Sequence, residues 1–332
     1  EGLTRSLFLT SGSDANEAAI AISKRYTGGY EIASPAVSFH GQSEAARAVT
    51  FTGWRQGYGP YSPGNYPMIA PYRYRCSFCK SKPDCDYSCL NTSFELLDAQ
   101  ADGQMAAVIT EPLFSAGGVI DLPQGWLQEL KKCCRNRGML LILDEAQTGL
   151  AKLGSMWASD QENVIPDICT ISKHFGGGVA VSAVMTTDEI ESRVSETEFV
   201  VAHSHSNDPL TSNAAIASID IILEQNLVNV SKQIGEYWRG HLNTLYDRYT
   251  LIGDIRGRGL LQGIELVKDR VTKEPAYLEG HEIGRRCLEN GLIFSLRRGG
   301  SVIRFVPPFT TTLAQMDLAA EILDNALKEV TL

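Results

Sequence analysis

Residues 139–143 read MLLIL, an entirely apolar run that is followed at once by two acidic residues, Asp144 and Glu145. A strand with one face in solvent alternates apolar and polar residues, whereas a strand covered on both faces is apolar throughout. The segment therefore predicts a buried strand of a parallel sheet. Ligands of such sheets bind at the carboxyl ends of the strands, which is where the two carboxylates stand.

Other short apolar runs alternate with stretches of helical periodicity. Gly138 ends a helix predicted at 124–137. Further strands are expected at 7–9, 106–110, 168–171 and 181–185. Strands separated by helices predict an α/β fold with a mostly parallel central sheet and helices on both faces.

The pattern changes after about residue 210. A long helical region is expected from 216 to 249, with a break near Asn226. It is followed by a glycine-punctuated strand segment, a helix, a strand and a last amphipathic helix, at 252–267, 281–290, 301–306 and 313–330. We therefore divide the chain into a large domain at 1–227 and a smaller C-terminal α+β domain at 228–332.

Composition narrows the class of protein. Of the 332 residues, 43% are hydrophobic and 21% charged, with a formal net charge of -9 and no Lys/Arg block. Nucleic acid and membranes are thus not expected as partners, and no apolar run approaches the roughly 18–20 residues that cross a bilayer. The start, EGLTRSLFLTSG, lacks the layout of a secretory signal. We expect a cytoplasmic protein whose N-terminal portion is missing from this chain.

Four of the eight cysteines lie close together in RYRCSFCKSKPDCDYSC, namely Cys76, Cys79, Cys85 and Cys89. This spacing leaves a structural zinc site open, but the second pair lacks the usual two-residue knuckle spacing. The preferred interpretation is a loop packed by its own cysteine and aromatic side chains. No metal is predicted.

The segment TSGSDANEAAI places a Ser/Gly turn between a predicted strand and an alanine-rich helix, with Asp14 and Asn16 as expected caps. Free backbone N–H groups and the positive end of the helix dipole favour a phosphate there. Most such turns only cap the helix. The motif alone leaves both interpretations open.

Lys173, in CTISKHFGGG, closes another apolar strand and precedes three glycines. A lysine at a buried strand end has a desolvated ammonium group, whose lowered pKa makes the amine nucleophilic, and the glycines let the backbone approach a ligand. Taken singly, such a lysine can also reach solvent, and Asp144 can cap a strand or join a salt bridge.

Together the three motifs are far more specific than each is alone. Pyridoxal 5'-phosphate (PLP) needs an anchor for its phosphate, a partner for its pyridine nitrogen and an amine for its aldehyde. The turn, Asp144 and Lys173 provide these groups. The combination predicts a PLP enzyme in which Lys173 carries the cofactor as a Schiff base.

Four motifs resemble the class III (ω-type) PLP aminotransferases of fold type I, namely DEAQTG, SK…GGG, Phe39-His40-Gly41 and Glu111-Pro112. Longer stretches, YEI…SFHG, HSNDPL and IGDIRGRGLLQGIELVKDRVTKEPA, are similar to the dialkylglycine decarboxylase branch. The resemblance covers essentially the whole chain. It implies fold type I and substrates that are an α-amino acid and a 2-oxo acid.

The resemblance also assigns residues to the cofactor. Lys173 matches the catalytic Schiff-base lysine, and Asp144 the partner of the ring nitrogen. Gln147 matches the residue that hydrogen-bonds the ring hydroxyl, and Phe39 takes the place of the stacking aromatic. The phosphate turn is matched by Ser11, Gly12 and Ser13.

Further residues are assigned to the substrate and to the neighbouring subunit. Arg304, in VIRFVPP, matches the arginine that holds the substrate carboxylate, and Glu111 a glutamate beside the active site. Ser204 replaces a threonine that reaches the phosphate of the neighbouring subunit. The resemblance thus implies a homodimer or a dimer of dimers.

The chain departs from the family at several positions. Residues 150–154 read LAKLG where the family usually has GxGRTG. Gln42 replaces a methionine that lines the decarboxylase pocket. In EPLFSAGG, Ser115 is a candidate substrate-binding residue, and Ala116 replaces a second serine that helps to hold the departing carboxylate. These changes concern the substrate and the reaction more than the cofactor.

The leading hypothesis is a PLP aminotransferase of the dialkylglycine decarboxylase type, which transfers the amino group with or without decarboxylation. A racemase, an epimerase or another carbon-centred reaction on the same scaffold is the second. A catalytically reduced homologue is the third.

Overall fold

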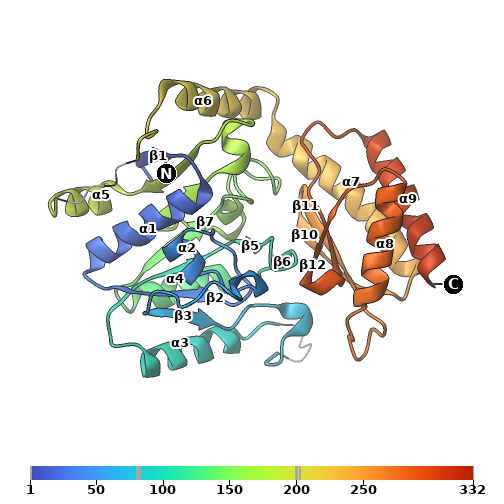
Figure 1. The fold of residues 1–332 in the computed structure, drawn as a ribbon, viewed down its shortest axis with the longest axis horizontal. Helices are drawn as coiled ribbons and strands as arrows, with labels where there is room; N and C mark the ends of the chain where they lie inside the picture. The colour runs from blue at the N-terminus through green and yellow to red at the C-terminus, as the bar shows by residue number, and fades with distance from the viewer. Residues whose placement is uncertain (1, 80–83, 199–200, 202, 332) are drawn as a thin grey trace. The chain divides into compact units, whose positions relative to one another are not determined.

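The computed structural model describes residues 2–79, 84–198, 201 and 203–331 (Figure 1). The chain forms two compact units, and each is built from three separate stretches. The first unit consists of Glu1–Pro112, Leu122–Leu150 and Trp157–Glu224. The second consists of Leu113–Asp121, Ala151–Met156 and Gln225–Leu332.

A seven-stranded sheet organises the first unit, in the order β1-β9-β8-β7-β4-β2-β3. The pairs from β8 to β3 are parallel, whereas β9 runs antiparallel to both of its neighbours. This confirms the predicted mostly parallel α/β sheet. The strands are β1 (Arg5–Leu9), β2 (Glu31–Pro35), β3 (Asn65–Met68), β4 (Met105–Thr110), β7 (Leu140–Asp144), β8 (Ile168–Ile171) and β9 (Ser182–Thr186).

The apolar run that predicted a buried strand is β7, and all five of its residues are buried. Leu140 and Ile142 pack in one core with side chains of α1 (Gly12–Thr27) and α5 (Asp188–Ser195). Helix α4 (Trp126–Arg135) contacts the same strand and ends shortly before Gly138, whose φ is 68°. Asp144 therefore stands at the carboxyl end of a strand covered by helices.

The remaining helices of the first unit are α2 (Glu44–Ala48), α3 (Ser88–Gln100) and α6 (Pro209–Glu224). Sequence analysis did not predict α2, α3, α5, β2 or β3. It did predict a break near Asn226, which has a positive φ of 49° and separates α6 from α7 (Leu227–Arg248).

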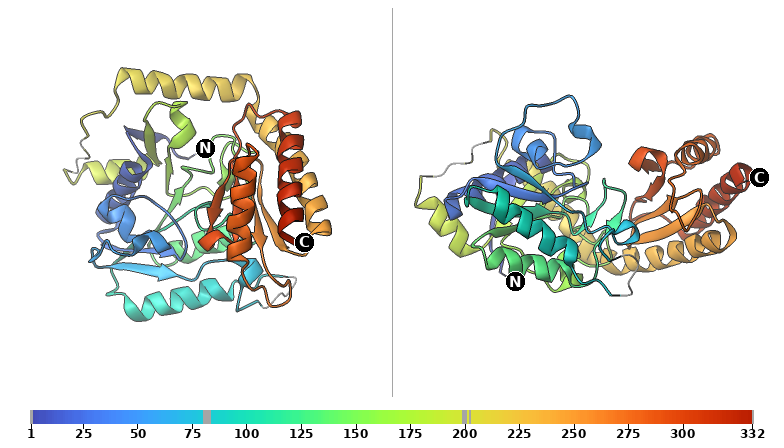
Figure 2. Two further views of the ribbon diagram at one scale, coloured as in Figure 1. Left: turned by 45° about the vertical axis from the view of Figure 1, so that its right-hand side comes forward. Right: turned by 90° about the horizontal axis from the view of Figure 1, so that it is seen from below.

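The second unit contains an antiparallel sheet in the order β10-β11-β13-β12, formed by Ile252–Arg258, Leu261–Leu266, Val302–Phe305 and Ser295–Arg297. A buried core joins it to α7, α8 (Tyr277–Glu289) and α9 (Leu313–Thr331), which can be followed in Figures 1 and 2. Two short strands, β5 (Leu113–Phe114) and β6 (Ile120–Asp121), also belong to this unit.

Strand alternation sets the direction of Arg304. Its neighbours Ile303 and Phe305 belong to the core with the three helices. Successive side chains of a strand point to opposite faces, so Arg304 points away from that core. Its guanidinium reaches Ser115, which follows β5.

The lengths and sequences of the described helices bear on membrane insertion. None of them is both long enough and apolar enough to cross a bilayer.

Candidate active site

The Ser/Gly turn at the start of α1 has the geometry of a capped helix. Ser11 is the N-cap, and its hydroxyl accepts the Asp14 N–H at 3.3 Å while the Asp14 carboxylate accepts the Ser11 N–H at 3.0 Å. Gly12 and Ser13 occupy the first two helical positions, whose N–H groups have no acceptor within a helix. The turn therefore caps α1 and still presents two backbone donors to an anion.

Two glycines keep space open around this turn. A Cβ on Gly12 would lie 2.7 Å from the Ser172 hydroxyl, and one on Gly41 would lie 2.3 Å from the Ser13 hydroxyl. Gly41 also has a φ of 141°, which side chains rarely tolerate. Any larger residue at either position would fill the space beside the turn.

Asn16 does not cap α1, contrary to the sequence prediction. It is buried within the helix, and its Nδ2 donates to the Asp144 carboxylate and to the His40 carbonyl oxygen, both at 2.7 Å. Its Oδ1 accepts the Thr170 hydroxyl at 2.7 Å. The amide is thus held in one orientation, with a donor directed at Asp144.

Three nitrogen atoms hold the Asp144 carboxylate: one of a side-chain amide, one of an imidazole ring and one of the backbone. Oδ2 lies 2.7 Å from Asn16 Nδ2 and 2.9 Å from His40 Nδ1, and Oδ1 accepts the Ala146 N–H at 3.0 Å. The second ring nitrogen of His40 lies 3.2 Å from the Ser34 hydroxyl. The carboxylate is therefore fixed in position by residues from three different parts of the sequence.

The same contacts keep Asp144 charged. Burial alone would raise its pKa, but the hydrogen bond and charge of His40, followed by the charge of Lys173, hold the pKa below its usual value. A buried carboxylate that stays ionised at neutral pH is suited to pair with a protonated ring nitrogen.

Lys173 directly follows Ser172 at the end of β8, next to β7 in the sheet. Its φ is 57°, a left-handed conformation that is costly for a lysine and is often found at functional sites. Sequence analysis predicted a desolvated side chain, but Lys173 is exposed in this chain. That prediction was wrong, because the described residues around the strand end leave the amine open.

These groups line one pocket of about 340 Å³. Its wall includes Phe39, His40, Asp144 and Lys173, together with Asn16 and the turn from Thr10 to Ser13. The volume lies in the range of small-ligand pockets. The pocket thus brings together an anion-binding turn, a buried carboxylate, a flat ring and an amine.

Other predicted residues lie outside the lining of this pocket. Glu111 is buried and accepts the Phe39 N–H at 3.0 Å, so it contacts the site through the backbone. Gln42 is exposed, and its N–H donates to the Ser13 hydroxyl. Gln147 is half-buried, and Ser204 is exposed in a turn before α6. None of the four is among the residues that line the pocket.

Glu145 has a structural role. Its buried carboxylate accepts the N–H groups of Ala158 and Ser159 and the Thr148 hydroxyl, at 3.1, 2.9 and 2.6 Å. Burial raises its pKa. Of the two acidic residues after the predicted strand, only Asp144 lines the pocket.

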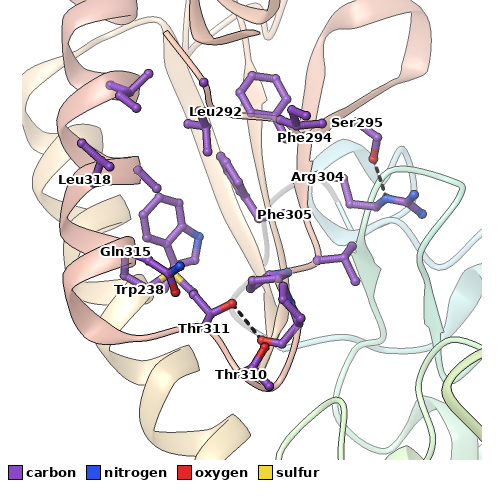
Figure 3. Close-up of a pocket in the computed structure, with 18 residues that line it drawn as sticks. Trp238, Leu292, Phe294, Ser295, Arg304, Phe305, Thr310, Thr311, Gln315 and Leu318 are labelled. Atoms are coloured by element: carbon purple, nitrogen blue, oxygen red, sulfur yellow. Dashed lines mark hydrogen bonds between the residues drawn. The ribbon is translucent and has the colours of Figure 1, made fainter. Parts of the chain in front are cut away.

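The predicted carboxylate-binding arginine belongs to the second unit. Arg304 donates through Nη1 to the Ser115 hydroxyl at 2.8 Å and through Nε to the Ser295 hydroxyl at 2.9 Å. Figure 3 shows Arg304 and Ser295 together beside a larger pocket that also contains Trp238 and Phe305. Ser115 is buried and Ala116 is half-buried.

The LAKLG departure has a visible backbone consequence. Leu150 and Ala151 have φ values of 53° and 71°. The left-handed region is where glycine is favoured over other residues. Ala151, which stands where GxGRTG has its second glycine, therefore holds a conformation that a glycine would hold with less strain.

The sequence analysis missed the roles of His40 and Asn16. His40 was noticed only as part of the FHG motif, and Asn16 only as a cap. Both lie more than 100 residues from Asp144 in sequence, with separations of 104 and 128. A polar residue inside an alanine-rich helix face was the available signal for Asn16.

Comparison with known proteins identifies the family. Residues 2–327 match the family described as aminotransferase class-III. The chain belongs to the class III aminotransferase family. An uncharacterized aminotransferase of Schizosaccharomyces pombe is 42% identical over 331 residues, which is 98% of this chain and 74% of that protein.

Two further proteins show the range of the family. The leucine/methionine racemase of Thermococcus litoralis is 33% identical over 97% of this chain and 73% of its own length. The solved structure of an amine transaminase from an uncultivated Pseudomonas species, in its PLP-bound form, has a TM-score of 0.90. It is 27% identical, with 98% of this chain and 77% of that chain covered. The family resemblance and fold type I are thus confirmed, and PLP is the cofactor.

The pocket fits this cofactor. The space that Gly12 and Gly41 keep open lies beside donors suited to a phosphate. Asp144 keeps its charge despite complete burial, which suits a cationic ring nitrogen. Lys173 lines the same pocket and has the only type of side-chain amine that reacts with an aldehyde.

Proposed function

We propose that this PLP-dependent enzyme transfers the amino group of an α-amino acid to a 2-oxo acid. The observation that supports the proposal most strongly is the pairing of a charged, buried Asp144 with Lys173 in one pocket. When bound, PLP delocalises the electron pair that is left at the substrate Cα when a bond to that carbon breaks. Asp144 favours this delocalisation by keeping the ring nitrogen protonated.

Each cofactor contact has a counterpart in the chain. The N–H groups of Gly12 and Ser13 and the hydroxyls of Ser11 and Ser13 are assigned to the phosphate. Phe39 is assigned to the ring face, and its backbone N–H is fixed by Glu111. Gln147 is assigned to the ring hydroxyl. These contacts would hold the cofactor beside Lys173.

Lys173 is assigned two steps. Its Nζ would hold the cofactor covalently, and when it is free it would act as the general base that accepts the proton from the substrate Cα. Because the Lys173 side chain is exposed, it has room to take both roles. The same proton transfer underlies transamination and racemisation.

Arg304 is assigned to the substrate carboxylate. A guanidinium binds a carboxylate through two parallel hydrogen bonds, which a lysine cannot reproduce. The hydroxyls of Ser115 and Ser295 orient the guanidinium. Glu111 and Gln42 are assigned to the substrate side of the site through their contacts with Phe39 and Ser13.

Arg304→Lys tests this assignment. We expect KM for an α-amino acid to rise about 10- to 100-fold, since one charge-assisted hydrogen bond contributes roughly 1.5–3 kcal/mol. KM for a simple amine should stay unchanged, because it has no carboxylate. Steady-state kinetics with both substrates measure the difference, and Arg285→Lys on the exposed face of α8 is the control. Equal effects on both substrates would contradict the assignment.

The dialkylglycine decarboxylase resemblance adds a second reaction, in which the carboxylate leaves before the amino group is transferred. Ala116 lacks the hydroxyl that would steady a carboxylate held perpendicular to the ring, and Gln42 is exposed. We therefore propose that decarboxylation is slower here than transamination.

Racemisation is the second candidate, favoured by the similarity to the leucine/methionine racemase. It uses the same lysine, cofactor and carboxylate contact and differs in the face that receives the proton back. No second reaction partner is required.

A panel of α-amino acids distinguishes the three reactions. With a 2-oxo acid present, we expect a new 2-oxo acid without CO2 release and without the opposite enantiomer. If Ala116→Ser releases CO2 from 2-aminoisobutyrate faster than the wild-type chain does, the scaffold retains a latent decarboxylase activity. If the enzyme instead forms the D-amino acid in the absence of any 2-oxo acid, its main activity is racemisation and not transamination.

We also propose a homodimer, or a dimer of dimers. Ser204 lies outside the pocket lining of its own chain and matches a residue that serves the neighbour's phosphate. Nearby, α6 exposes four large apolar side chains, Leu210, Ile216, Ile221 and Leu223. Several large apolar side chains exposed on one helix indicate a surface that another chain covers.

Light scattering of the PLP-bound protein should give at least twice the mass of one chain. Ile216→Glu places a charge on the exposed part of α6 and should shift the population toward single chains. Leu278→Glu is the control, since Leu278 is 81% exposed in the second unit. A single-chain mass with PLP still bound would contradict the dimer.

A further inference from the structure

Four cysteines converge in the segment that leads into α3, namely Cys76, Cys79, Cys85 and Cys89. Cys79 and Cys89 are buried, and Cys76 and Cys85 are half-buried. None of the described residues of this segment lines the pocket that contains Lys173. What it does is therefore a separate question from the proposed function.

One pair of sulfurs has the spacing of a metal-thiolate site. Cys79 Sγ lies 3.9 Å from Cys85 Sγ. In a tetrahedral zinc site with Zn–S bonds of about 2.3 Å, two thiolates stand about 3.8 Å apart. A disulfide requires about 2.05 Å. The pair is thus at the separation of two ligands of one metal ion.

The other two thiols lie next to this pair. The backbone N–H of Cys79 donates to Cys76 Sγ at 3.4 Å, so the first Cys-x-x-Cys turn is already folded around a sulfur. Cys89 is buried in the first turn of α3, four residues after Cys85. Cys79 thus contacts both Cys76 and Cys85, and Cys89 lies in the helix that follows.

A buried donor also points to a charged sulfur in this cluster. Trp126 is fully buried, and its indole N–H has no hydrogen-bond partner among the described residues. The Tyr87 hydroxyl donates to the Gln124 carbonyl oxygen at 2.8 Å, so the start of α3, which holds Cys89, lies beside the start of α4, which holds Trp126. Buried N–H groups are nearly always paired, and a thiolate at Cys89 would be an acceptor here.

The backbone adopts an uncommon conformation where the cysteine segment meets α3. Tyr87 precedes α3 in a left-handed conformation, with a φ of 55°, and provides no side-chain cap. No three described His, Cys, Asp or Glu side chains already form a complete metal-binding arrangement. Binding therefore requires the Cys76 and Cys89 side chains to turn toward the Cys79–Cys85 pair.

We propose that Cys76, Cys79, Cys85 and Cys89 together bind one zinc-type divalent cation that closes this segment onto α3 and Trp126. All four ligands are thiolates, which favour zinc over oxygen-preferring cations. A complete set of four protein ligands is typical of a structural rather than a catalytic site. The ion would stabilise the segment and leave the PLP chemistry to Lys173.

The test uses the PLP-bound chain purified without chelators. Elemental analysis should give one zinc per chain. After exchange with Co²⁺, the protein should show the visible bands of tetrahedral cobalt thiolate. Cys85→Ser should lose the zinc and lower the thermal unfolding midpoint while PLP remains bound.

Cys133→Ser is the matched control, because Cys133 is also half-buried but lies in α4. It should keep one zinc per chain. Wild-type protein that contains four free thiols in this segment and no zinc, even after incubation with Zn²⁺, would overturn the proposal. A Cys79–Cys85 disulfide found by peptide mapping of zinc-free native protein would overturn it as well.

Discussion

Lys173→Ala is expected to abolish the covalent attachment of PLP and to reduce turnover by at least about 10²–10⁴-fold, the usual contribution of a general base. The effect should be this large because one side chain both attaches the cofactor and transfers the proton. Borohydride reduction followed by peptide mapping should place the pyridoxyl group on Lys173 in the wild-type chain and on no residue in the variant.

Lys24→Ala is a suitable control, since Lys24 is a half-buried lysine of α1 outside the pocket lining. It should retain the label and the turnover. Label on a lysine other than Lys173 in the wild-type protein would remove Lys173 from the mechanism.

Asp144→Asn should leave PLP bound but lower turnover by at least about 10- to 100-fold, the contribution of one charge-assisted hydrogen bond. The amide still contacts its neighbours but no longer keeps the ring nitrogen protonated. Because the pKa of Asp144 is lowered in the folded chain, its charge is present at neutral pH and is lost only at a lower pH than for an ordinary aspartate. Cofactor content and single-turnover rates measure the two effects separately.

Glu145→Gln is the matched control at the next residue. Its carboxylate is equally buried but holds the Ala158 and Ser159 backbone instead of lining the pocket. We expect lower stability and nearly normal turnover per folded molecule. Normal turnover in Asp144→Asn would show that the carboxylate does not assist the reaction.

The strands that could be predicted are those buried on both faces. β4, β7 and β8 consist mainly of apolar residues, and these apolar runs are sufficient to predict the strands. β3 reads NYPM and pairs with one neighbour only, at the edge of the sheet. Proline and polar residues are tolerated at such an edge, so local sequence gives little indication of a strand there.

The residues assigned to the cofactor could be proposed from the sequence because each stands at the end of a predicted element. Asp144 is the last residue of β7. Lys173 follows β8, and Ser11 is the N-cap of α1. His40 and Asn16 could not be assigned in this way, because their contacts with Asp144 join distant segments of the chain. The exposure of Lys173 was missed for the same reason, since burial depends on which other segments pack nearby.

The way the second unit is assembled has a consequence for how the chain folds. Beyond residues 225–332, it includes 113–121, which contains Ser115, and 151–156. A fragment that starts at 228 would lack Ser115 and the partner that Arg304 has there. The unit therefore cannot be completed until residues more than 100 positions apart have met, which makes its contacts long-range in sequence. Such contacts slow folding, and Arg304 should be among the last residues of this unit to reach its final position.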